Sequence, residues 1–594
     1  MGEEKGKRSG RLETGLHGCN QIFLRGVCPV RERKSFPMGH KDRSRVHLAT
    51  VSGVATTKPE LIRWFENNVE HVDVITTKSF QVRPNPGNRE PVICETTEGN
   101  FGNSVGLRNP GMETALPQLE KLRQEGLKAW LNVSVSADNP DDFTTLVRAF
   151  DEVADSVELN FSCPHAKAGF GASIGVDINI ATDYVRRICE SYPERRSLLF
   201  IKLTPNVDNI GKIAKAVIDA GADGISAINT VGPVLHIDPT CGEPILQNSL
   251  GGKGGESGAW VFERAIECIR EIRNAVGDDV PIIGMGGVSD ALTCAEMIEA
   301  GADVVGIGSA LAHVRQQDWP AFFREIAQGE PSTVTRRSGR VMEYRPFTVT
   351  EKILHCEDTL LLKLDGSMAS FKAGEFVFLW IPGTGEKPFS VAVPDPLTFI
   401  IKKRGVFTQA VFDNLKEGDT IMLRGPYGAE ADTPKTSKAI IVAGGTGEAV
   451  AYPLALKLKD QNTSMSFLVG TSVDGNRGIL EKELSVFGSY LCVSDHGKPG
   501  RILDYLDDEI NRQTSDGTSI RDIAFYLIGP EIFMKIASSK LRNAGADADR
   551  ILLSMERNSM CGVGLCGECS CGGHLACQWG TFMKLSFHKK ECVL

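Results

Sequence analysis

A pattern of strand, loop and helix repeats eight times between Val46 and about Gln328, and this repeat constrains the fold more than any other feature. Each strand candidate is a short run rich in β-branched residues, as expected of strands buried on both faces. The runs span 46–52, 71–79, 129–135, 156–162, 198–204, 224–230, 281–287 and 304–310. Amphipathic stretches separate them, for example 140–154, 208–219 and 260–275. Eight such units in about 280 residues predict a (β/α)8 TIM barrel, and an open doubly wound sheet is the alternative.

Two other patterns follow the barrel. Residues 340–430 contain short alternating strands separated by turn residues, which is typical of an antiparallel β-barrel. From Lys438 onward, strand–loop–helix units return and indicate a small parallel sheet. We therefore expect five regions: an N-terminal extension (1–45), the (β/α)8 barrel (46–330), an antiparallel β-barrel (338–433), an α/β domain (434–551) and a C-terminal segment (552–594). The extension has no clear periodicity and points to no function.

The C-terminal segment contains closely spaced cysteines. Their spacing, C-x4-C-x2-C followed by a fourth cysteine after seven residues, is the plant-ferredoxin pattern for a 2Fe–2S cluster. A zinc knuckle is the alternative, but zinc sites usually have two C-x2-C pairs and this run has one. The expected metal ligands are Cys561, Cys566, Cys569 and Cys577. Cys571 and Cys592 remain alternatives to Cys577 as the fourth ligand.

Composition excludes several classes of protein. The chain has 594 residues and a formal net charge of −9, without a basic patch, so nucleic acid is not an expected partner. No apolar run is long enough to span a bilayer. The sequence has no recognisable targeting signal, and its isolated cysteines are expected to be reduced. Both features predict a cytoplasmic protein. Whether identical chains associate is left open.

In a (β/α)8 barrel the reactive groups lie at the carboxyl ends of the strands. Glycines follow the seventh and eighth strands, where these barrels often bind a phosphate. Amide and hydroxyl side chains at other strand ends suit a heterocycle with several donors and acceptors. Lys78 and Lys202 could stabilise negative charge on a reduced flavin. The strand ends therefore predict a site for a phosphorylated, heterocyclic cofactor.

The barrel sequence resembles class 1 dihydroorotate dehydrogenases. The strings ITTKS, NSVGLRNPG, ELNFSCP, IKLTPNV, AINTVGP, GGKGG, IIGMGGV and GIGSAL occur in order over about residues 46–315. The resemblance implies FMN bound by Ser52, Lys78, Asn132, Asn160, Lys202, Gly258, Gly286, Gly287, Gly308 and Ser309. It implies a pyrimidine bound by Lys78, Asn103, Val105, Gly106, Leu107, Asn160, Asn229 and Thr230. It also implies catalytic roles for Lys78 and for Cys163, the base that takes the C5 proton while hydride leaves C6 for the flavin.

Residues 340–594 resemble the electron-transfer subunit of the NAD-linked (class 1B) dihydroorotate dehydrogenases. That subunit is usually a separate chain, and the resemblance implies that it is fused to the barrel here. Three turns are similar to its FAD motifs, with Lys387 where the family usually has arginine. The resemblance implies FAD bound by Lys387, Pro388, Phe389, Ser390, Thr408 and Gly425, and NAD bound by Gly444, Gly445, Gly447 and Gly529. The implied activity is oxidation of dihydroorotate to orotate in pyrimidine biosynthesis. Electrons would pass from FMN through the 2Fe–2S cluster and FAD to NAD+.

Two departures from the family keep other functions open. His165 stands after Cys-Pro, where the family usually has asparagine, and this resembles dihydropyrimidine dehydrogenase. A dihydrouracil dehydrogenase or reductase is therefore one alternative, although the motif 103–107 favours dihydroorotate. Glu448 adjoins the expected nicotinamide phosphates and could repel a dinucleotide. An electron-transfer module that serves another redox partner is the second alternative.

Overall fold

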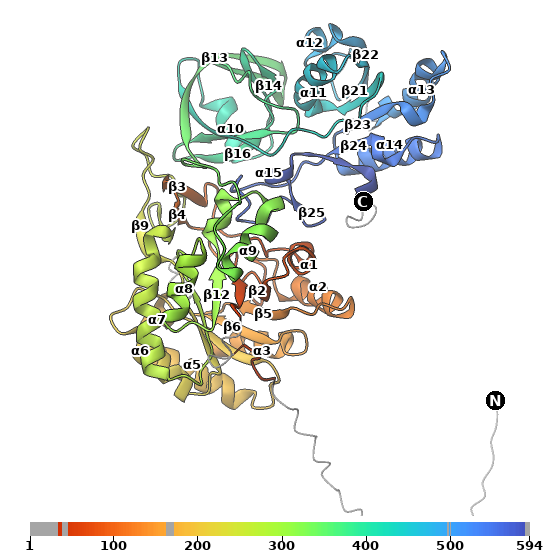
Figure 1. Ribbon diagram of the computed structural model, residues 1–594. Helices are drawn as coiled ribbons and strands as arrows, with labels where there is room; N and C mark the ends of the chain where they lie inside the picture. Colours follow the sequence, from red (N-terminus) through yellow and green to blue (C-terminus); the bar gives the residue numbers. More distant parts are fainter. Residues whose placement is uncertain are drawn as a thin grey trace, which may run out of the picture.

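A computed structural model describes residues 34–38, 45–161, 172–473, 475–495, 498 and 500–587. Figure 1 shows the N-terminal barrel in the lower part and two C-terminal sheets in the upper part. The short helix α15 (Ala576–Trp579) and the strand β25 (Ser570–Cys571) lie between these parts. The cysteine-bearing segment is thus placed at the junction between the barrel and the C-terminal half.

The lower part is a closed barrel of eight parallel strands, as the sequence predicts. Strand β1 pairs with both β12 and β2, and this double pairing closes the ring. The closed ring excludes the open doubly wound sheet. The strands are β1 (Leu48–Thr50), β2 (Val72–Thr76), β5 (Trp130–Val135), β6 (Ser156–Asn160), β7 (Leu198–Lys202), β8 (Gly224–Ala227), β11 (Ile282–Met285) and β12 (Val304–Ile307).

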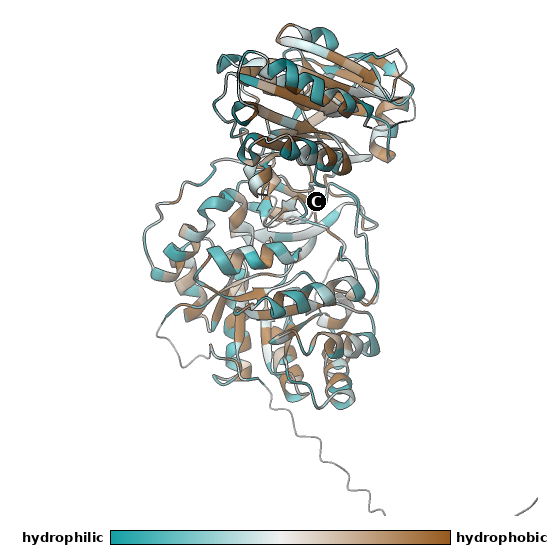
Figure 2. Cartoon of the chain, turned by 90° about the vertical axis from the view of Figure 1, so that its right-hand side faces the viewer, coloured by the Kyte–Doolittle hydropathy of each residue, from teal (hydrophilic) through white to brown (hydrophobic). Residues whose placement is uncertain are grey.

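Amphipathic helices surround the barrel. In α3 (Pro140–Phe150) the buried residues Phe143, Leu146, Val147 and Phe150 recur at helical spacing, and the Asn139 side chain caps the amino end. Figure 2 shows apolar strands inside the barrel and polar outer helix faces. The other helices are α1 (Pro59–Asn68), α2 (Met112–Gln124), α4 (Ala172–Val176), α5 (Ile178–Ser191), α6 (Ile210–Asp219), α7 (Phe262–Val276), α8 (Ala291–Glu299) and α9 (Trp319–Gln328). Short 3-10 turns are η1 (Ala259–Val261), η2 (Ser309–His313) and η3 (Gln316–Asp318).

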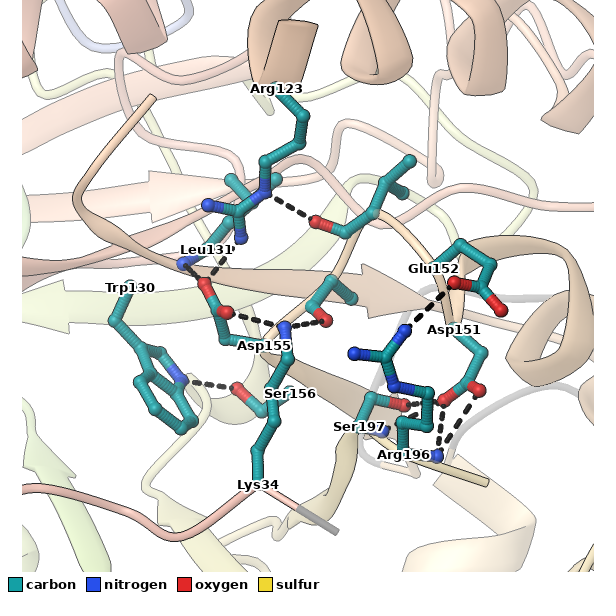
Figure 3. A network of polar contacts seen from close by, with 12 residues as sticks. Lys34, Arg123, Trp130, Leu131, Asp151, Glu152, Asp155, Ser156, Arg196 and Ser197 are labelled. Carbon is teal, nitrogen blue, oxygen red and sulfur yellow. Dashed lines mark hydrogen bonds and ion pairs between the residues drawn. The ribbon is translucent and has the colours of Figure 1, made fainter. Parts of the chain in front are cut away.

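Residues 34–38 close the end of the barrel at which the strands begin. The Phe36 ring lies 5.3 Å from Trp130 and 5.4 Å from Phe200, measured between ring centroids. Lys34 Nζ lies 2.6 Å from Asp155 Oδ1, and Arg123 contacts the same carboxylate (Figure 3). This part of the predicted extension is therefore integral to the barrel core.

We expect Phe36→Ala to lower the free energy of unfolding of the barrel by about 2 kcal/mol, because a half-buried aromatic side chain is lost from a packed cluster. Chemical denaturation followed by circular dichroism measures the change. Ser35→Ala, at an exposed neighbouring position, is the control and should change the value little. Equal stability of the two variants would contradict a packing role for Phe36.

A four-stranded antiparallel sheet joins the barrel strands, and the sequence pattern did not predict it. Its order is β3 (Ile93–Thr97), β4 (Asn100–Asn103), β10 (Lys253–Gly258) and β9 (Val231–Leu235). These strands are short, and β10 contains three glycines, so they lack the alternation that identifies a strand. Only the pairing of distant segments, 100–103 with 255–258, makes them a sheet.

Residues 344–427 form a seven-stranded antiparallel sheet with the helix α10 (Val406–Asp413). The antiparallel pattern agrees with the prediction. The pairing, however, is that of a sheet with two end strands, β16 and β17, and not of a closed ring. In order the strands are β16 (Gly385–Phe389), β15 (Phe376–Ile381), β19 (Thr420–Tyr427), β13 (Tyr344–Cys356), β14 (Thr359–Leu364), β18 (Leu397–Lys402) and β17 (Val393–Pro394).

A six-stranded sheet completes the upper part. It contains β22 (Gly488–Ser494), β21 (Ser464–Thr471), β20 (Lys438–Gly444), β23 (Ala524–Ile528) and β24 (Ile551–Ser554) in parallel, and β27 (Phe582–Lys584) antiparallel to β24. Its helices are α11 (Glu448–Asp460), α12 (Glu481–Ser485), α13 (Leu506–Thr514) and α14 (Glu531–Asn543). The 3-10 turns are η4 (Gly445–Gly447), η5 (Arg501–Tyr505), η6 (Ile520–Asp522) and η7 (Ala548–Arg550).

The four cysteines lie in residues 555–581, the segment between β24 and β27, which we call the cysteine excursion. The chain leaves after β24, forms the short hairpin of β25 with β26 (His574–Leu575), and returns as β27. The sequence prediction began a separate segment at residue 552, but Leu552 is paired within the sheet. Both ends of the excursion are therefore fixed. Within the described ranges, no helix is both long and apolar enough to cross a membrane.

Candidate functional site

A cavity lies at the carboxyl ends of the barrel strands, where the sequence predicts the reactive groups. The structure brings nearly all of the expected FMN and pyrimidine residues to its wall. These are Ser52, Lys78, Asn103, Val105, Gly106, Leu107, Asn160, Lys202, Asn229, Thr230, Gly258, Gly286, Gly287, Gly308 and Ser309. Cys163, the expected base, and His165 lie outside the described residues. The parallel strands converge at one rim, and so residues far apart in sequence meet there.

The polar floor of the cavity is held by hydrogen bonds between strands. Asn160 Nδ2 donates to Ser79 Oγ at 3.1 Å, and Asn229 Nδ2 donates to Asn160 Oδ1 at 3.4 Å. The Ser52 and Ser79 hydroxyl oxygens are 3.2 Å apart. These contacts fix amides and hydroxyls before a ligand arrives. A planar heterocycle with several polar edges fits such a set.

Lys202 and Glu158 are two of the charged residues that line the cavity, together with Lys78 and Glu256. Burial lowers the pKa of the Lys202 ammonium, and the nearby Glu158 carboxylate opposes that change. Glu158 is itself buried and accepts a hydrogen bond from Ser134 Oγ at 3.0 Å. The sequence analysis did not select Glu158. The signal was available, because Glu158 and Asn160 are two residues apart on a strand and share one face.

Asn132 is fully buried and is not among the residues that line the cavity, and its predicted contact with the cofactor stays a prediction. Strand β5 continues for three residues beyond it to Val135, which places Asn132 within the barrel. Its Oδ1 accepts from Ser156 Oγ at 2.7 Å, and its Nδ2 lies 3.5 Å from Glu158 Oε2. Asn132 therefore lies beside the Glu158 carboxylate, which lines the cavity.

A glycine cradle is present where a phosphate is expected. Gly287 has a φ of +78°, and a Cβ there would lie 2.7 Å from the Cβ of Phe262. A Cβ on Gly308 would lie 2.9 Å from Val51 Cγ2. Only glycine lets the backbone pass so closely and present its amides to the cavity. The residues present therefore fit FMN, and Lys78 and Lys202 would supply positive charge to it.

The four cysteines of the predicted cluster are buried and converge. The Cys577 thiol lies within hydrogen-bonding reach of the thiols of Cys561 and Cys569, and Cys561 also reaches Cys566. Cys566 N donates to Cys561 Sγ at 3.4 Å. Among the described residues, no three metal-binding side chains surround a single ion position. A 2Fe–2S cluster does not need three, because each iron takes two cysteine thiolates.

The polar atoms around these cysteines also fit a cluster. Ser570 Oγ, Gln578 Nε2 and Arg337 Nε are buried without a hydrogen-bond partner in the described structure. Buried donors are nearly always satisfied, and cluster sulfur atoms would be acceptors for them. Cys571 lies apart, with its Sγ 3.7 Å from an Arg557 nitrogen. The other alternative fourth ligand, Cys592, lies outside the described residues.

The cysteine segment is docked on the barrel beside the cavity. Ala55 N donates to Leu565 O at 2.8 Å, and Thr57 Oγ1 donates to Cys566 O at 3.1 Å. Lys58 Nζ donates to Glu568 O at 2.7 Å. Leu565 itself forms part of the cavity wall. Sequence reasoning missed this residue, because no motif predicts which part of a distant segment reaches the barrel.

The expected FAD residues lie on neighbouring elements of the seven-stranded sheet. The rings of Phe389 and Phe407 are 6.0 Å apart, which brings the motif that contains Pro388 and Ser390 next to the first turn of α10. Thr408 Oγ1 caps that helix by accepting from Gly405 N at 3.0 Å. Gly425 lies on β19, two strands from β16.

The ammonium group of Lys387 is already paired with the barrel. Its Nζ lies 2.9 Å from Glu90 Oε2, and Arg108 lies 3.2 Å from the other oxygen of that carboxylate. Burial alone would raise the pKa of Glu90, but Lys387 and Arg108 lower it below its ordinary value. A pyrophosphate would have to compete with Glu90 for Lys387. The fit of these residues to FAD therefore depends more on the turns than on this cation.

The expected NAD residues meet at the carboxyl ends of β20 and β23. A Cβ on Gly529 would lie 3.6 Å from Gly444 N, so little room separates the two turns. Gly445 and Gly447 belong to the 3-10 turn that leads into α11. A helix amino end beside parallel strand ends suits a pyrophosphate. The backbone of this region fits a dinucleotide.

The expectation that Glu448 would repel a dinucleotide is not supported by its geometry. Its carboxylate accepts from Ile479 N at 2.8 Å, Leu480 N at 2.9 Å and the Tyr490 hydroxyl at 3.1 Å. Burial raises the pKa of this carboxyl despite these donors. The Glu448 side chain therefore joins the amino end of α11 to the backbone of residues 479–480.

His313 links the barrel to the chain that leaves it. Its Nε2 lies 3.0 Å from Glu95 Oε1, and its Nδ1 lies 2.8 Å from Arg337 O. Burial lowers the pKa of His313, but the contacts with Glu95 and the Arg337 carbonyl outweigh it, so the pKa is raised. The folded state thus prefers the protonated imidazole.

This preference predicts a pH dependence of stability. The contribution of His313 is fully present below the unfolded pKa, ~6.5, and is lost as pH rises through the higher folded pKa. His313→Gln should therefore cost stability in mildly acidic solution and cost less in alkaline solution. Thermal unfolding of both proteins across this range measures the difference. A constant difference at every pH would contradict the ion-pair account.

Comparison with known proteins shows that the N-terminal half is similar to dihydroorotate dehydrogenases. The family profile "Dihydroorotate dehydrogenase" matches residues 46–329. The catalytic subunit of dihydroorotate dehydrogenase B (NAD(+)) from Methanothermobacter thermautotrophicus is 38% identical over 255 residues, 43% of this chain and 79% of that protein. The corresponding subunit from Pyrococcus abyssi is 36% identical over 282 residues, 48% of this chain and 88% of that protein. The profile ends where the barrel ends.

Proposed function

The chain belongs to the dihydroorotate dehydrogenase family and is an oxidoreductase, and we propose that it oxidises dihydroorotate to orotate and passes the electrons to NAD+ within one polypeptide. The observation that carries this proposal is the wall of the barrel cavity. One of its lining residues, Leu565, comes from the loop between the first two cysteines of the predicted cluster. A cavity for a flavin and a loop for an iron–sulfur cluster therefore share a boundary.

The barrel residues have distinct roles in this proposal. Asn103, Asn160, Asn229 and Thr230 would bind the polar edges of the pyrimidine, and the amides of the loop that contains Gly106 would face its carboxylate. Leu107 has a φ of +56° and Gly106 a φ of +73°, and both residues of this left-handed turn lie at the cavity wall. Cys163 would take the C5 proton, since thiolates stabilised by neighbours act as bases.

The cofactors would supply the redox chemistry. FMN, a 2Fe–2S cluster and FAD, when bound, would together connect a two-electron substrate with single-electron transfer and then with NAD+. The chain's own residues would bind and separate these groups. Lys78 and Lys202 would stabilise negative charge in the barrel, and the cysteine excursion would hold the cluster between barrel and C-terminal sheets. Gly444, Gly445, Gly447 and Gly529 would contact the dinucleotide.

An anaerobic experiment tests this function. Purified full-length protein is analysed for FMN, FAD, iron and sulfide, and then mixed with dihydroorotate in the absence of NAD+. We expect immediate bleaching of the flavin absorbance and, after NAD+ is added, formation of NADH. Bleaching by dihydrouracil but not by dihydroorotate would favour the dihydropyrimidine alternative that His165 suggests. No bleaching by either compound would favour an electron-transfer module.

A further inference from the structure

The segment that joins the barrel to the seven-stranded sheet is fixed against both parts. It runs from α9 to β13. Arg337 N donates to His313 O at 2.8 Å, and the Tyr427 hydroxyl donates to Val341 O at 3.0 Å. Met342 N donates to the buried Glu95 carboxylate at 3.1 Å. A connection with this many anchors holds its side chains in defined positions, unlike a flexible linker.

The guanidinium of Arg337 lies near Cys561 and Cys577 of the cysteine excursion. Burial lowers the pKa of this group, and the thiols of Cys577 and Cys561 are among the neighbours that oppose the change. One terminal nitrogen donates to Ala312 O. Its Nε is buried and has no hydrogen-bond partner among the described residues, and within the same residues Arg337 forms no ion pair with a carboxylate. An arginine remains protonated even where its pKa is lowered, so a half-buried cation without a carboxylate partner among the described residues lies near these thiols.

Two other arginines near the excursion differ from Arg337. Arg424 is fully buried and donates to Cys561 O at 2.7 Å, but Glu386 neutralises its charge. Arg315 donates to Gln578 O at 3.3 Å and is exposed, so water screens its charge. Among these three arginines, Arg337 alone combines a buried, unpaired Nε with a charge that no carboxylate neutralises in the described structure.

We infer that Arg337 donates its Nε–H to the iron–sulfur cluster held by the cysteine excursion and makes that cluster easier to reduce. The inference deepens the proposed function and rests on the cluster being present. A cluster with four thiolates is negative, and reduction adds one more electron. A nearby cation and a hydrogen bond to sulfur stabilise the reduced form more than the oxidised form, which raises the reduction potential.

This inference gives the joining segment a role beyond connection. The cation reaches the cluster only because the chain passes from the barrel to the sheet beside it. The same segment is anchored at His313, the last residue of the turn that begins at the cavity residue Ser309. Arg337 is thus a positioning residue that joins the flavin cavity and the cluster through one short stretch of chain.

The test compares Arg337→Gln, Arg337→Lys and the control Arg315→Gln in the full-length protein, purified anaerobically. Iron and sulfide content comes first, because its absence from the wild type would overturn the proposed function itself. In loaded proteins, redox titration followed by electron paramagnetic resonance gives the midpoint potential and spectrum of the cluster.

For Arg337→Gln we expect a more negative potential, equivalent to about a tenfold fall in the equilibrium constant for reduction, and an altered spectrum. Arg337→Lys keeps the charge and should lower the potential less than Arg337→Gln does. Arg315→Gln should change the potential little. An unchanged potential and spectrum in loaded Arg337→Gln would overturn the inference and leave the proposed function intact. Equal shifts in Arg337→Gln and Arg315→Gln would also overturn it, because a general charge effect would then suffice.

Discussion

Cys577→Ser is expected to abolish electron delivery to NAD+ while dihydroorotate still bleaches the flavin in the barrel. Removal of even an outer partner of a metal ligand typically costs about 10- to 100-fold, so loss of a ligand should lower NADH formation by at least about 100-fold. The barrel residues that contact the substrate are not altered. Stopped-flow absorbance under anaerobic conditions measures flavin bleaching, and steady-state NADH formation measures the complete route.

Cys571→Ser is the matched control for this prediction. Cys571 lies six residues earlier, is also buried, and contacts Arg557 instead of the four converging thiols. The control should retain iron, sulfide and NADH formation. If Cys571→Ser lost the iron and Cys577→Ser kept it, the assignment of the fourth ligand would be wrong.

Arg424→Ala is expected to destabilise the C-terminal half by about 3–5 kcal/mol, because it leaves a buried carboxylate without its partner. The Arg424 and Glu386 side chains are both fully buried and joined by two hydrogen bonds of 2.6 and 2.8 Å. The guanidinium carbon also lies 3.9 Å from the centroid of the Phe378 ring. Calorimetry should show a lower unfolding temperature for the C-terminal half.

Two further variants distinguish the loss of the buried ion pair from the loss of an arginine in general. Arg345→Ala removes an exposed arginine from the same sheet and should change stability by less than about 0.5 kcal/mol. The double variant Arg424→Met with Glu386→Leu removes both charges and should recover much of the loss, since apolar replacements of buried ion pairs are often tolerated. An unfolding temperature unchanged by Arg424→Ala would contradict this account.

The barrel and most of its cavity were predictable from the sequence. Eight β-branched runs at regular spacing specify a barrel, and the barrel specifies that residues such as Lys78, Asn160 and Asn229 meet at one rim. Asn132, by contrast, lies three residues before the end of its strand. Periodicity fixes a strand end only to within a few residues. Glu158 was missed although it begins the motif ELNFSCP and lies on the same strand face as Asn160.

Local sequence determined the elements of this protein and the chemistry of their ends, because hydrophobic spacing and glycine turns act within a few residues. Tertiary structure alone decided which distant parts touch. Leu565 reaches the barrel cavity, Glu90 pairs with Lys387, and Arg337 lies near Cys577. Each of these contacts joins segments more than 200 residues apart, and their energy depends on packing and burial that no local pattern encodes.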